Sequence, residues 1–538
     1  MSLSSFGGKY LLPGIAAVLS GAATLLPGPG RPTTGILEYI KQSWKVLTRS
    51  HDRLALEAAD PKFKVPPGGR WPVYVAVDED LERVTNELRA QMEPADWEKI
   101  SLRTLAQGQA PVPAPGLLYL PRPYVVPGGR FNEMYGWDSF FIQMGLLRDG
   151  DVALAADMAD NALYEIRAYG KILNANRTYY LTRSQPPFLT GMLLAVFART
   201  KDRKWLAASL PEIEKYYQYW TSEPHLTPQT GLSRYFDSGS GPAPEVVSSE
   251  LDKRGRTDYD LVKAYFRTHN HITDYDVSQF YDARRDRLTE AFYQGDRSMR
   301  ESGFDPSNRF GPFSADIVHY NPVCLNSLLY LMEMQTAEIL KLLDREREAE
   351  RWTQRAADRA AAINRLSWDE NQGLYFDYDF ALKRVRRYPF LTTFYPLWAG
   401  IASPEQARRV RDNLPLFERP GGLQTSTYQS GDQWDAPYGW APLQWIAVEG
   451  LRRYGFQEDA ERVSRRFLTM VQQVYSQHGV IVEKYDVVRP GSRVAAGLRF
   501  GYHSNEVGFG WTNAVYTALF DGLSPHGQAD LQRQGKAD

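Results

Sequence analysis

Apolar residues recur at helical spacing along most of the chain after residue 34, and this periodicity predicts a largely helical protein. Within residues 151–170 they occupy one helical face, at Val152, Leu154, Ala155, Met158, Ala162 and Leu163. Residues 403–414 begin with Ser-Pro and carry a glutamine three residues after the serine, which predicts a capping box at a helix start. Two further segments, 326–343 and 442–455, are apolar enough to be inner, buried helices.

Long loops rich in glycine, proline, tryptophan and aspartate separate these helical segments, and strand signals are few. Only residues 373–380 and 479–488 suggest short β-like stretches or hairpins. No repeat of 20–50 residues is visible, which disfavours an open solenoid. The pattern therefore predicts an all-α protein, and a single closed ring of helix pairs fits it better than a solenoid does. We expect one domain over residues 31–525 and a flexible tail over 526–538.

The composition of the chain is that of an ordinary globular protein. It has 538 residues, of which 43% are hydrophobic, and a formal net charge of -1. This balance gives no electrostatic footprint for nucleic acid or for an anionic membrane surface. Aromatic residues reach 13%, which suits a packed core as well as it suits stacking against carbohydrate. The single cysteine, Cys324, excludes an intrachain disulfide.

Residues 9–30, "KYLLPGIAAVLSGAATLLPGPG", form an uncharged, mostly apolar run that follows one lysine. This run resembles a secretory signal with a weak basic start, so we expect residues 1–30 to be a leader and the protein to be periplasmic or secreted. The alternative is a Gly/Pro-rich tail on a cytoplasmic protein. No other apolar run reaches the length of a membrane span, and we expect a mature chain without one.

Several catalytic signatures are missing from the sequence. It contains neither His-Glu-x-x-His nor a pair of cysteines, and no glycine-rich phosphate loop follows a strand. The Gly-x-Ser-x-Gly motif of serine hydrolases does not occur. We therefore expect neither a metal ion nor an organic cofactor.

Carboxylates beside aromatic residues occur instead in four separate loops. The segments are "RFNEMYGWDSFF", "GDQWDAPYGWAPLQW", "ESGFDPSNRF" and "VEKYD". Cleavage of an acetal needs one carboxylic acid to protonate the leaving oxygen and a second carboxylate to activate water or attack the sugar. Aromatic walls raise the pKa of the acid by excluding water, and arginines keep other carboxylates ionised. The loops thus indicate glycoside hydrolysis.

Six segments of the chain, three of which overlap these loops, resemble segments of the trehalases, glycoside hydrolase family 37. "PGGRFNEMYGWDSFF" is similar to the first family signature and "QWDAPYGWAPLQ" to the second. "NANRTYYLTRSQPP", "PGGLQTS", "VEKYDV" and "GFGWTN" also resemble family segments and come in family order. The resemblance covers residues 121–523.

This resemblance implies an (α/α)6 barrel that hydrolyses α,α-trehalose to two glucose molecules with inversion. Asp305 in "SGFDPSNR" would be the general acid, and Glu483 in "EKYD" the general base. The disaccharide would be bound by the remaining matched positions: Arg130, Trp137, Asp138, Asn174, Arg183, Ser184, Gln185, Glu245 and Gly303. We expect the protein to be a monomer without a metal or cofactor.

Three positions depart from the family pattern. Ala243 stands where an arginine is usual before Pro-Glu, and Arg254 or Arg256 would have to replace it. Cys324 stands where an aspartate is usual. Residues 487–507 replace the glycine-rich lid ending in Gly-Glu-Tyr, so Glu506 would have to supply the lid carboxylate.

Two other functions remain open on the sequence. A related (α/α)6 glycosidase could cleave a different α-glucoside or an α-mannoside, and substrate profiling would separate it from a trehalase. A non-catalytic sugar-binding protein could keep the fold alone. The presence of both Asp305 and Glu483 argues against such a binder, because binding needs no acid opposite a base.

Overall fold

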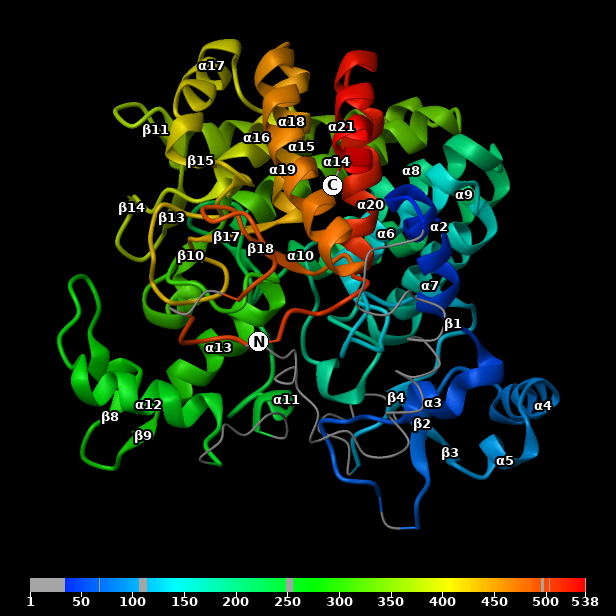
Figure 1. Cartoon of the computed structure of the whole chain (residues 1–538). Helices are drawn as coiled ribbons and strands as arrows, with labels where there is room; N and C mark the ends of the chain where they lie inside the picture. Colours follow the sequence, from blue (N-terminus) through cyan, green and yellow to red (C-terminus); the bar gives the residue numbers. More distant parts are fainter. Residues whose placement is uncertain are drawn as a thin grey trace.

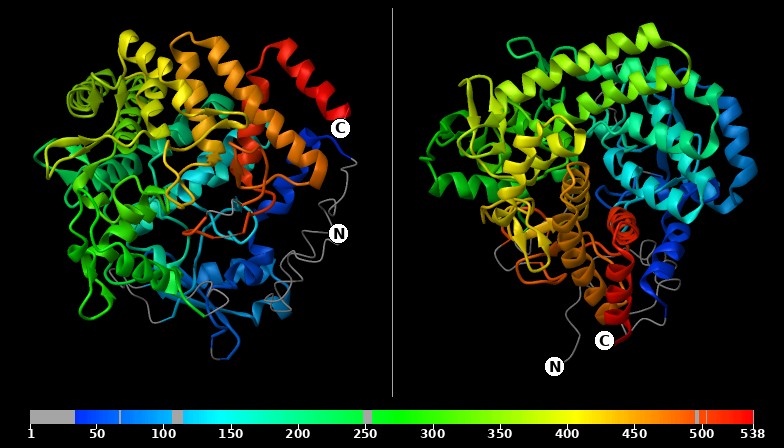
Figure 2. Two further views of the ribbon diagram at one scale, coloured as in Figure 1. Left: turned by 60° about the vertical axis from the view of Figure 1, so that its left-hand side comes forward. Right: turned by 90° about the horizontal axis from the view of Figure 1, so that it is seen from above.

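Six helices pack into a closed ring in the computed structural model, which describes residues 34–66, 68–105, 114–247, 255–494, 498–502 and 504–537. Each ring helix contacts the next one along the ring, and the last contacts the first. Seen from above in Figure 2, the chain runs around the ring from cyan through green and yellow to red. The ring helices are α6 (Gly136–Asp149), α8 (Leu189–Thr200), α14 (Val323–Leu342), α16 (Tyr395–Ala399), α18 (Ala441–Arg453) and α20 (Gly510–Asp521).

A second layer of helices packs against the ring from outside (Figure 1). In α15 the buried residues, among them Ala349, Trp352 and Ala356, recur every three or four positions, which gives this helix a single apolar face. Ring helix α20 is covered on more sides, and ten of its 12 residues are buried. The arrangement is the predicted (α/α)6 barrel. The outer helices include α2 (Ile36–Leu47), α7 (Val152–Tyr169), α10 (Leu210–Trp220), α15 (Glu346–Leu366) and α19 (Gln457–His478).

The helices predicted from periodicity are present. Helix α7 begins after Asp151, whose side chain accepts a hydrogen bond from the Leu154 amide, and it ends at Gly170 with a φ of 82°. Helix α17 (Pro404–Asp412) has the predicted capping box between Ser403 and Gln406. The two apolar segments form ring helices α14 and α18, as expected for inner helices.

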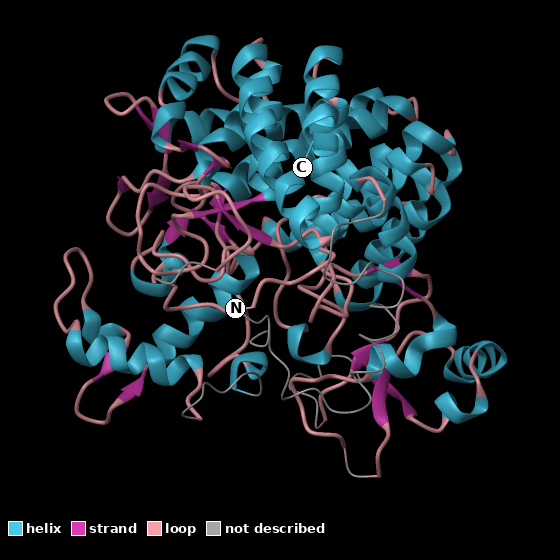
Figure 3. Ribbon diagram, viewed as in Figure 1, coloured by secondary structure: helices cyan, strands magenta, loops and turns pink. Residues whose placement is uncertain are grey.

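Strands are short and lie mainly below the ring in the view of Figure 3. One small sheet was not predicted: β2 (Trp71–Ala76) pairs in parallel with β3 (Ile100–Leu105) and with β4 (Leu117–Leu118). Parallel neighbours need a crossover, and helix α4 (Leu81–Gln91) lies in the connection from β2 to β3. The predicted β-like stretches hold β12 and β13 (374–379) and β18 (Lys484–Asp486).

A lobe with its own apolar cluster projects from the barrel at the lower left of Figure 1. It contains α11 (Pro244–Val247), α12 (Asp258–Thr268), β8 (Tyr281–Asp282) and β9 (Arg287–Leu288). Phe266 of α12 packs edge-on against Phe292 and Phe313, with ring centroids 6.2 and 5.7 Å apart. We refer to residues 241–247 and 255–296 as the α12 lobe.

A flexible tail was predicted for residues 526–538, but residues 526–537 form most of helix α21 (Pro525–Ala537). Gln472 of α19 donates a hydrogen bond to the Leu531 carbonyl, and Arg465 pairs with Asp530 at 3.0 Å. Leu531 is buried in this contact, and such burial is what a solvated tail lacks. The predicted leader, residues 1–30, lies outside the described residues, and the predicted domain boundaries stay a prediction. In the described ranges, no helix is both long and apolar enough to cross a membrane.

Candidate active site

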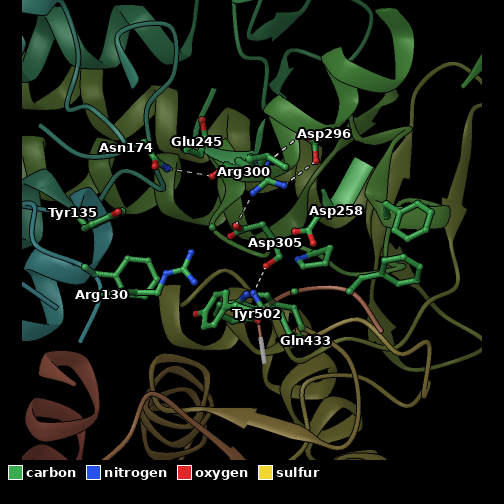
Figure 4. A pocket seen from close by; sticks show the side chains of 18 of the residues that line it. Arg130, Tyr135, Asn174, Glu245, Asp258, Asp296, Arg300, Asp305, Gln433 and Tyr502 are labelled. Atoms are coloured by element: carbon green, nitrogen blue, oxygen red, sulfur yellow. Dashed lines mark hydrogen bonds and ion pairs between the residues drawn. The ribbon is translucent and has the colours of Figure 1, made fainter. Parts of the chain in front are cut away.

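The loops between the helices enclose a cavity of about 680 Å³, a size typical of small-molecule sites (Figure 4). Its walls come from segments far apart in the sequence, including the two signature segments, helix α13 (Glu290–Ser302) and Glu483, which precedes strand β18 (Lys484–Asp486). Ten of the twelve predicted site residues line it: Arg130, Trp137, Asp138, Asn174, Arg183, Gln185, Glu245, Gly303, Asp305 and Glu483.

Four tryptophans form one apolar wall of this cavity. Trp434 and Trp440 of the second signature segment stack in parallel, with ring centroids 3.9 Å apart. Trp137 meets Trp434 at 5.9 Å and Trp511 at 5.6 Å. The Trp137 amide donates to the side-chain oxygen of Gln185, which fixes the start of helix α6. Such indole faces can cover the apolar face of a sugar ring.

Asp138, in the first turn of α6, is 4% exposed. Burial raises its pKa well above the usual value, and the nearby carboxylates of Glu483 and Asp305 add to the rise. The residue before the helix is Tyr135, which makes no side-chain cap. Asp138 therefore lines the cavity rather than serving as the N-cap of α6, and its raised pKa favours the protonated carboxyl, which can donate a hydrogen bond to a sugar hydroxyl.

Asp305 follows the end of helix α13, where Gly303 turns the backbone with a φ of 77°. Burial raises the pKa of Asp305 to about 6, while the positive charges of Arg300 and Arg183 oppose that rise. Its side chain is 34% exposed, so the carboxyl remains accessible to a ligand in the cavity. A carboxyl with a pKa of about 6 is still protonated in about one molecule in ten at pH 7, far more often than an ordinary aspartic acid, and the protonated form can transfer its proton to a leaving oxygen.

The structural alternative for Asp305, a pair with Arg309, is absent. Arg309 donates instead to both oxygens of Asp377, at 2.7 and 2.6 Å. Its Nη2 also lies 3.5 Å from the Cys324 sulfur. A carboxylate from another segment, Asp377, thus neutralises Arg309 beside the position where Cys324 departs from the family pattern.

Glu483 immediately precedes strand β18, which pairs in antiparallel fashion with β17 (Tyr438–Trp440) of the second signature segment. Its side chain is 2% exposed, and burial raises its pKa to about 7 against the opposing effects of Lys484 and Tyr502. Oε1 accepts a hydrogen bond from the Tyr502 hydroxyl. Oε2 is buried and has no hydrogen-bond partner among the described residues.

Arg183 and Glu245, which also line the cavity, form a buried ion pair, and each is 8% exposed or less. Asp237 lies 3.6 Å from the same guanidinium. Arg183 holds the pKa of Glu245 below its usual value despite burial. Both side chains therefore present fixed charges to the cavity, as hydrogen-bond partners for sugar hydroxyls.

Two predicted binding residues do not line the cavity. The Ser184 hydroxyl donates to the Ile172 carbonyl, and the Ser184 amide donates to Glu301, so this residue supports the loop. Glu506 accepts hydrogen bonds from the Arg130 amide and from the Ser504 hydroxyl. Both carboxylate oxygens of Glu506 are thus engaged by neighbouring loop residues.

The cavity also contains residues that sequence reasoning missed or left open. Arg300, at the end of α13, lies 3.1 Å from Asp296 and 3.5 Å from Asp305. Arg256 of the α12 lobe lines the cavity, whereas Arg254 lies outside the described residues. Arg300 stands four residues after Asp296, a spacing typical of helical ion pairs, and that spacing was the available signal.

Tyr502 is the other missed residue, and Figure 4 shows it beside Gln433 and Asp305. No sequence signal marked it, because its contact with Glu483 depends on the path of residues 498–506. In the described part of the chain, no group of three or more His, Cys, Asp or Glu side chains is placed to hold a metal ion. The functional groups that the cavity offers are thus carboxyls, guanidinium groups, amides and indoles.

Comparisons with known proteins agree with this geometry. The family profile described as Trehalase matches residues 38–524. The cytosolic neutral trehalase of Emericella nidulans is 34% identical, over 92% of this chain and 73% of that protein. The cytosolic neutral trehalase of Neurospora crassa is 37% identical, over 90% and 72%. A solved structure of neutral trehalase from Saccharomyces cerevisiae superposes with a TM-score of 0.77 at 33% identity, over 93% of this chain and 96% of that one.

The same comparisons overturn the predicted location. These relatives are named cytosolic enzymes, so the expectation of a periplasmic or secreted protein with a cleaved leader is wrong. That expectation rested on the apolar run at residues 9–30, which has the small, uncharged composition of a leader.

Proposed function

The chain belongs to the trehalase family, and from this premise we propose that its cavity hydrolyses α,α-trehalose to two glucose molecules with inversion, Asp305 acting as acid and Glu483 as base. One observation carries the assignment of roles. Asp305 and Glu483, 178 residues apart, line one cavity, and each has a pKa raised towards neutrality by burial.

In the proposed reaction, Asp305 transfers its proton to the oxygen between the two sugars as the bond to the attacked carbon breaks. Glu483 takes a proton from a water molecule, which attacks that carbon from the opposite face. The free Oε2 of Glu483 supports this role, because it can accept a hydrogen bond from the water. An inverting site needs the two carboxyl groups roughly 6.5–9.5 Å apart so that the water fits between them.

The remaining cavity residues are proposed to hold the disaccharide. Asp138 and the Arg183–Glu245 pair offer donors and acceptors to the hydroxyls, and Trp137 offers an apolar face. Arg300 and Arg256 are proposed to supply the positive charge that Ala243 does not. The position of Arg300 supports this role, because its guanidinium lies 3.5 Å from the carboxylate of Asp305, the proposed acid.

We further propose that the protein acts as a monomer. All of the residues proposed for catalysis and binding come from one chain. Light scattering coupled to size-exclusion chromatography tests this directly, because a monomer has a mass of 61.2 kDa.

The test of function is incubation of the purified protein with trehalose, followed by NMR of the anomers formed in the first minutes. Inversion at one carbon of an α,α-linked pair releases one β-glucose and one α-glucose in equal amounts. Retention would release α-glucose from both halves. Parallel incubations with maltose and kojibiose separate a trehalase from a glycosidase of broader α-glucoside specificity, and equal hydrolysis of all three would reject the trehalose assignment.

A further inference from the structure

A tyrosine from the segment that departs from the family pattern contacts the proposed base. The Tyr502 hydroxyl donates a hydrogen bond to Oε1 of Glu483, and Oε2 stays buried without a partner among the described residues. On the premise of the proposed function, we propose that Tyr502 is the positioning residue of the base. It holds one carboxylate oxygen of Glu483 and leaves the other to bind and deprotonate the attacking water.

The position of Tyr502 is fixed by a buried lysine. Lys484 is fully buried, and its ammonium group donates to the Tyr502 carbonyl and to the Gln433 side-chain oxygen, each at 3.0 Å. The same ammonium lies 3.7 Å from the centroid of the Tyr502 ring, a cation–π distance. Gln433 in turn donates to the Asp305 carbonyl at 2.5 Å. One network thus connects the acid and base segments through Lys484 and Gln433, and Tyr502 is held by the same lysine.

The chain just before Tyr502 is held by the α12 lobe and the second signature segment. The Phe500 ring meets Phe313 edge-on, with centroids 4.4 Å apart, and also meets Tyr265 of α12 at 6.0 Å. The amides of Arg499 and Phe500 donate to the Gly431 carbonyl at 2.8 and 3.2 Å. These contacts give the Tyr502 backbone little freedom, so its hydroxyl has a defined position.

Because Tyr502 donates the hydrogen bond and Glu483 accepts it, Tyr502 affects the protonation state of Glu483. Burial and the Glu483 charge raise the pKa of Tyr502 well above the usual value, so its hydroxyl keeps its proton at neutral pH. A donor on Oε1 stabilises the ionised carboxylate, which is the form that can act as a base. The positive charges of Lys484 and Arg130 also favour the ionised form of Glu483, whereas the negative charge of Glu506 opposes it. Asp138 and Glu483 likewise oppose each other's ionisation. The charge of Asp305 raises the pKa of both Tyr502 and Asp138.

The test is the Tyr502→Phe variant, which removes the hydroxyl and keeps the ring under Lys484. Loss of a hydrogen bond to a carboxylate is expected to raise the pKa of Glu483 by about one unit. Because the optimum lies midway between the two apparent pKa values, the optimum of kcat/KM should move up by about half a pH unit. At pH 6 the variant should lose about ten-fold in kcat/KM through kcat, with KM changed less than about two-fold.

Tyr265→Phe is the matched control. Tyr265 packs on Phe500 in the same wall but has no contact with Glu483, so removal of its hydroxyl should leave the pH optimum unchanged. Thermal melting of both variants checks that each is folded.

Two results would overturn the proposal: a Tyr502→Phe enzyme with an unmoved pH optimum, whatever its rate, or a loss confined to KM. An inactive wild-type protein would refute the proposed function instead, so the two failures are distinguishable.

Discussion

The guanidinium of Arg300 lies 3.5 Å from the carboxylate of Asp305, five residues further along the chain. This positive charge holds down a carboxyl pKa that burial raises, so Arg300 sets how readily the proposed acid gives up its proton. The two effects together leave the pKa of Asp305 at about 6.

Replacing Arg300 by glutamine removes that charge, so the pKa of Asp305 should rise. A rise of about one unit would move the pH optimum of kcat/KM upward by about half a unit, since both apparent pKa values define the optimum. The measurement is a pH profile beside Arg347→Gln, which changes an exposed arginine on α15. An Arg300→Gln optimum at or below that of the wild type would contradict the proposed electrostatic role.

Asp305→Asn and Glu483→Gln each remove one proton-transfer group and keep the side chain's shape. Each should lower kcat by about a hundred- to ten-thousand-fold, with the melting temperature close to that of the wild type. Steady-state kinetics with trehalose measures the effect. A turnover near normal in either folded variant would remove that residue from the mechanism.

The pH dependence of the wild-type enzyme should be bell-shaped, because activity needs a proton on Asp305 and none on Glu483. Activity falls in acid as Glu483 becomes protonated, and falls in alkali as Asp305 loses its proton. With pKa values of about 6 and about 7 for these groups, the optimum should lie near pH 6.5. Measurement of kcat/KM from pH 4 to pH 9 decides the matter, and a profile flat across this range would rule out the two-carboxyl mechanism.

The helices of the barrel were predictable because helix formation leaves a local signal, whereas the (α/α)6 arrangement itself was implied by the family resemblance. The apolar face of α7, the capping box at Ser403 and the apolar runs of α14 and α18 each reflect interactions within a few residues. The parallel sheet of β2, β3 and β4 depends on pairing across a crossover, and helix α21 depends on docking against α19. Neither long-range contact leaves a pattern in the segment itself.

The candidate site was predictable where a residue sits within a recognisable segment, as Asp305 and Glu483 do. Position within a segment does not fix the direction of a side chain, which is why Ser184 and Glu506 were expected in the cavity and lie outside it. Tyr502 shows the converse. It reaches Glu483 only because Lys484 and Phe500 fix the path of a segment that departs from the family pattern.

The backbone turn at Gly303, two residues before Asp305, helps to position the Asp305 carboxyl, and it is the basis of a last prediction. The backbone at Gly303 is left-handed, and an added Cβ would lie 3.1 Å from the Trp137 ring. Gly303→Ala should therefore destabilise the fold by about 1–2 kcal/mol through backbone strain. It should also lower kcat about ten-fold or more, since displaced site groups lose their catalytic geometry.

Gly150→Ala provides the matched control for this change. Gly150 ends α6 with a φ of 92° and has nothing within 4 Å of an added Cβ. Chemical denaturation of the Gly150→Ala variant should show a similar loss of stability. The variant should keep its activity, because backbone strain at Gly150 displaces no residue of the cavity. Equal activity losses in the two variants would show that the Trp137 contact has no special part in catalysis, and full activity in Gly303→Ala would show that the tryptophan wall tolerates the displacement.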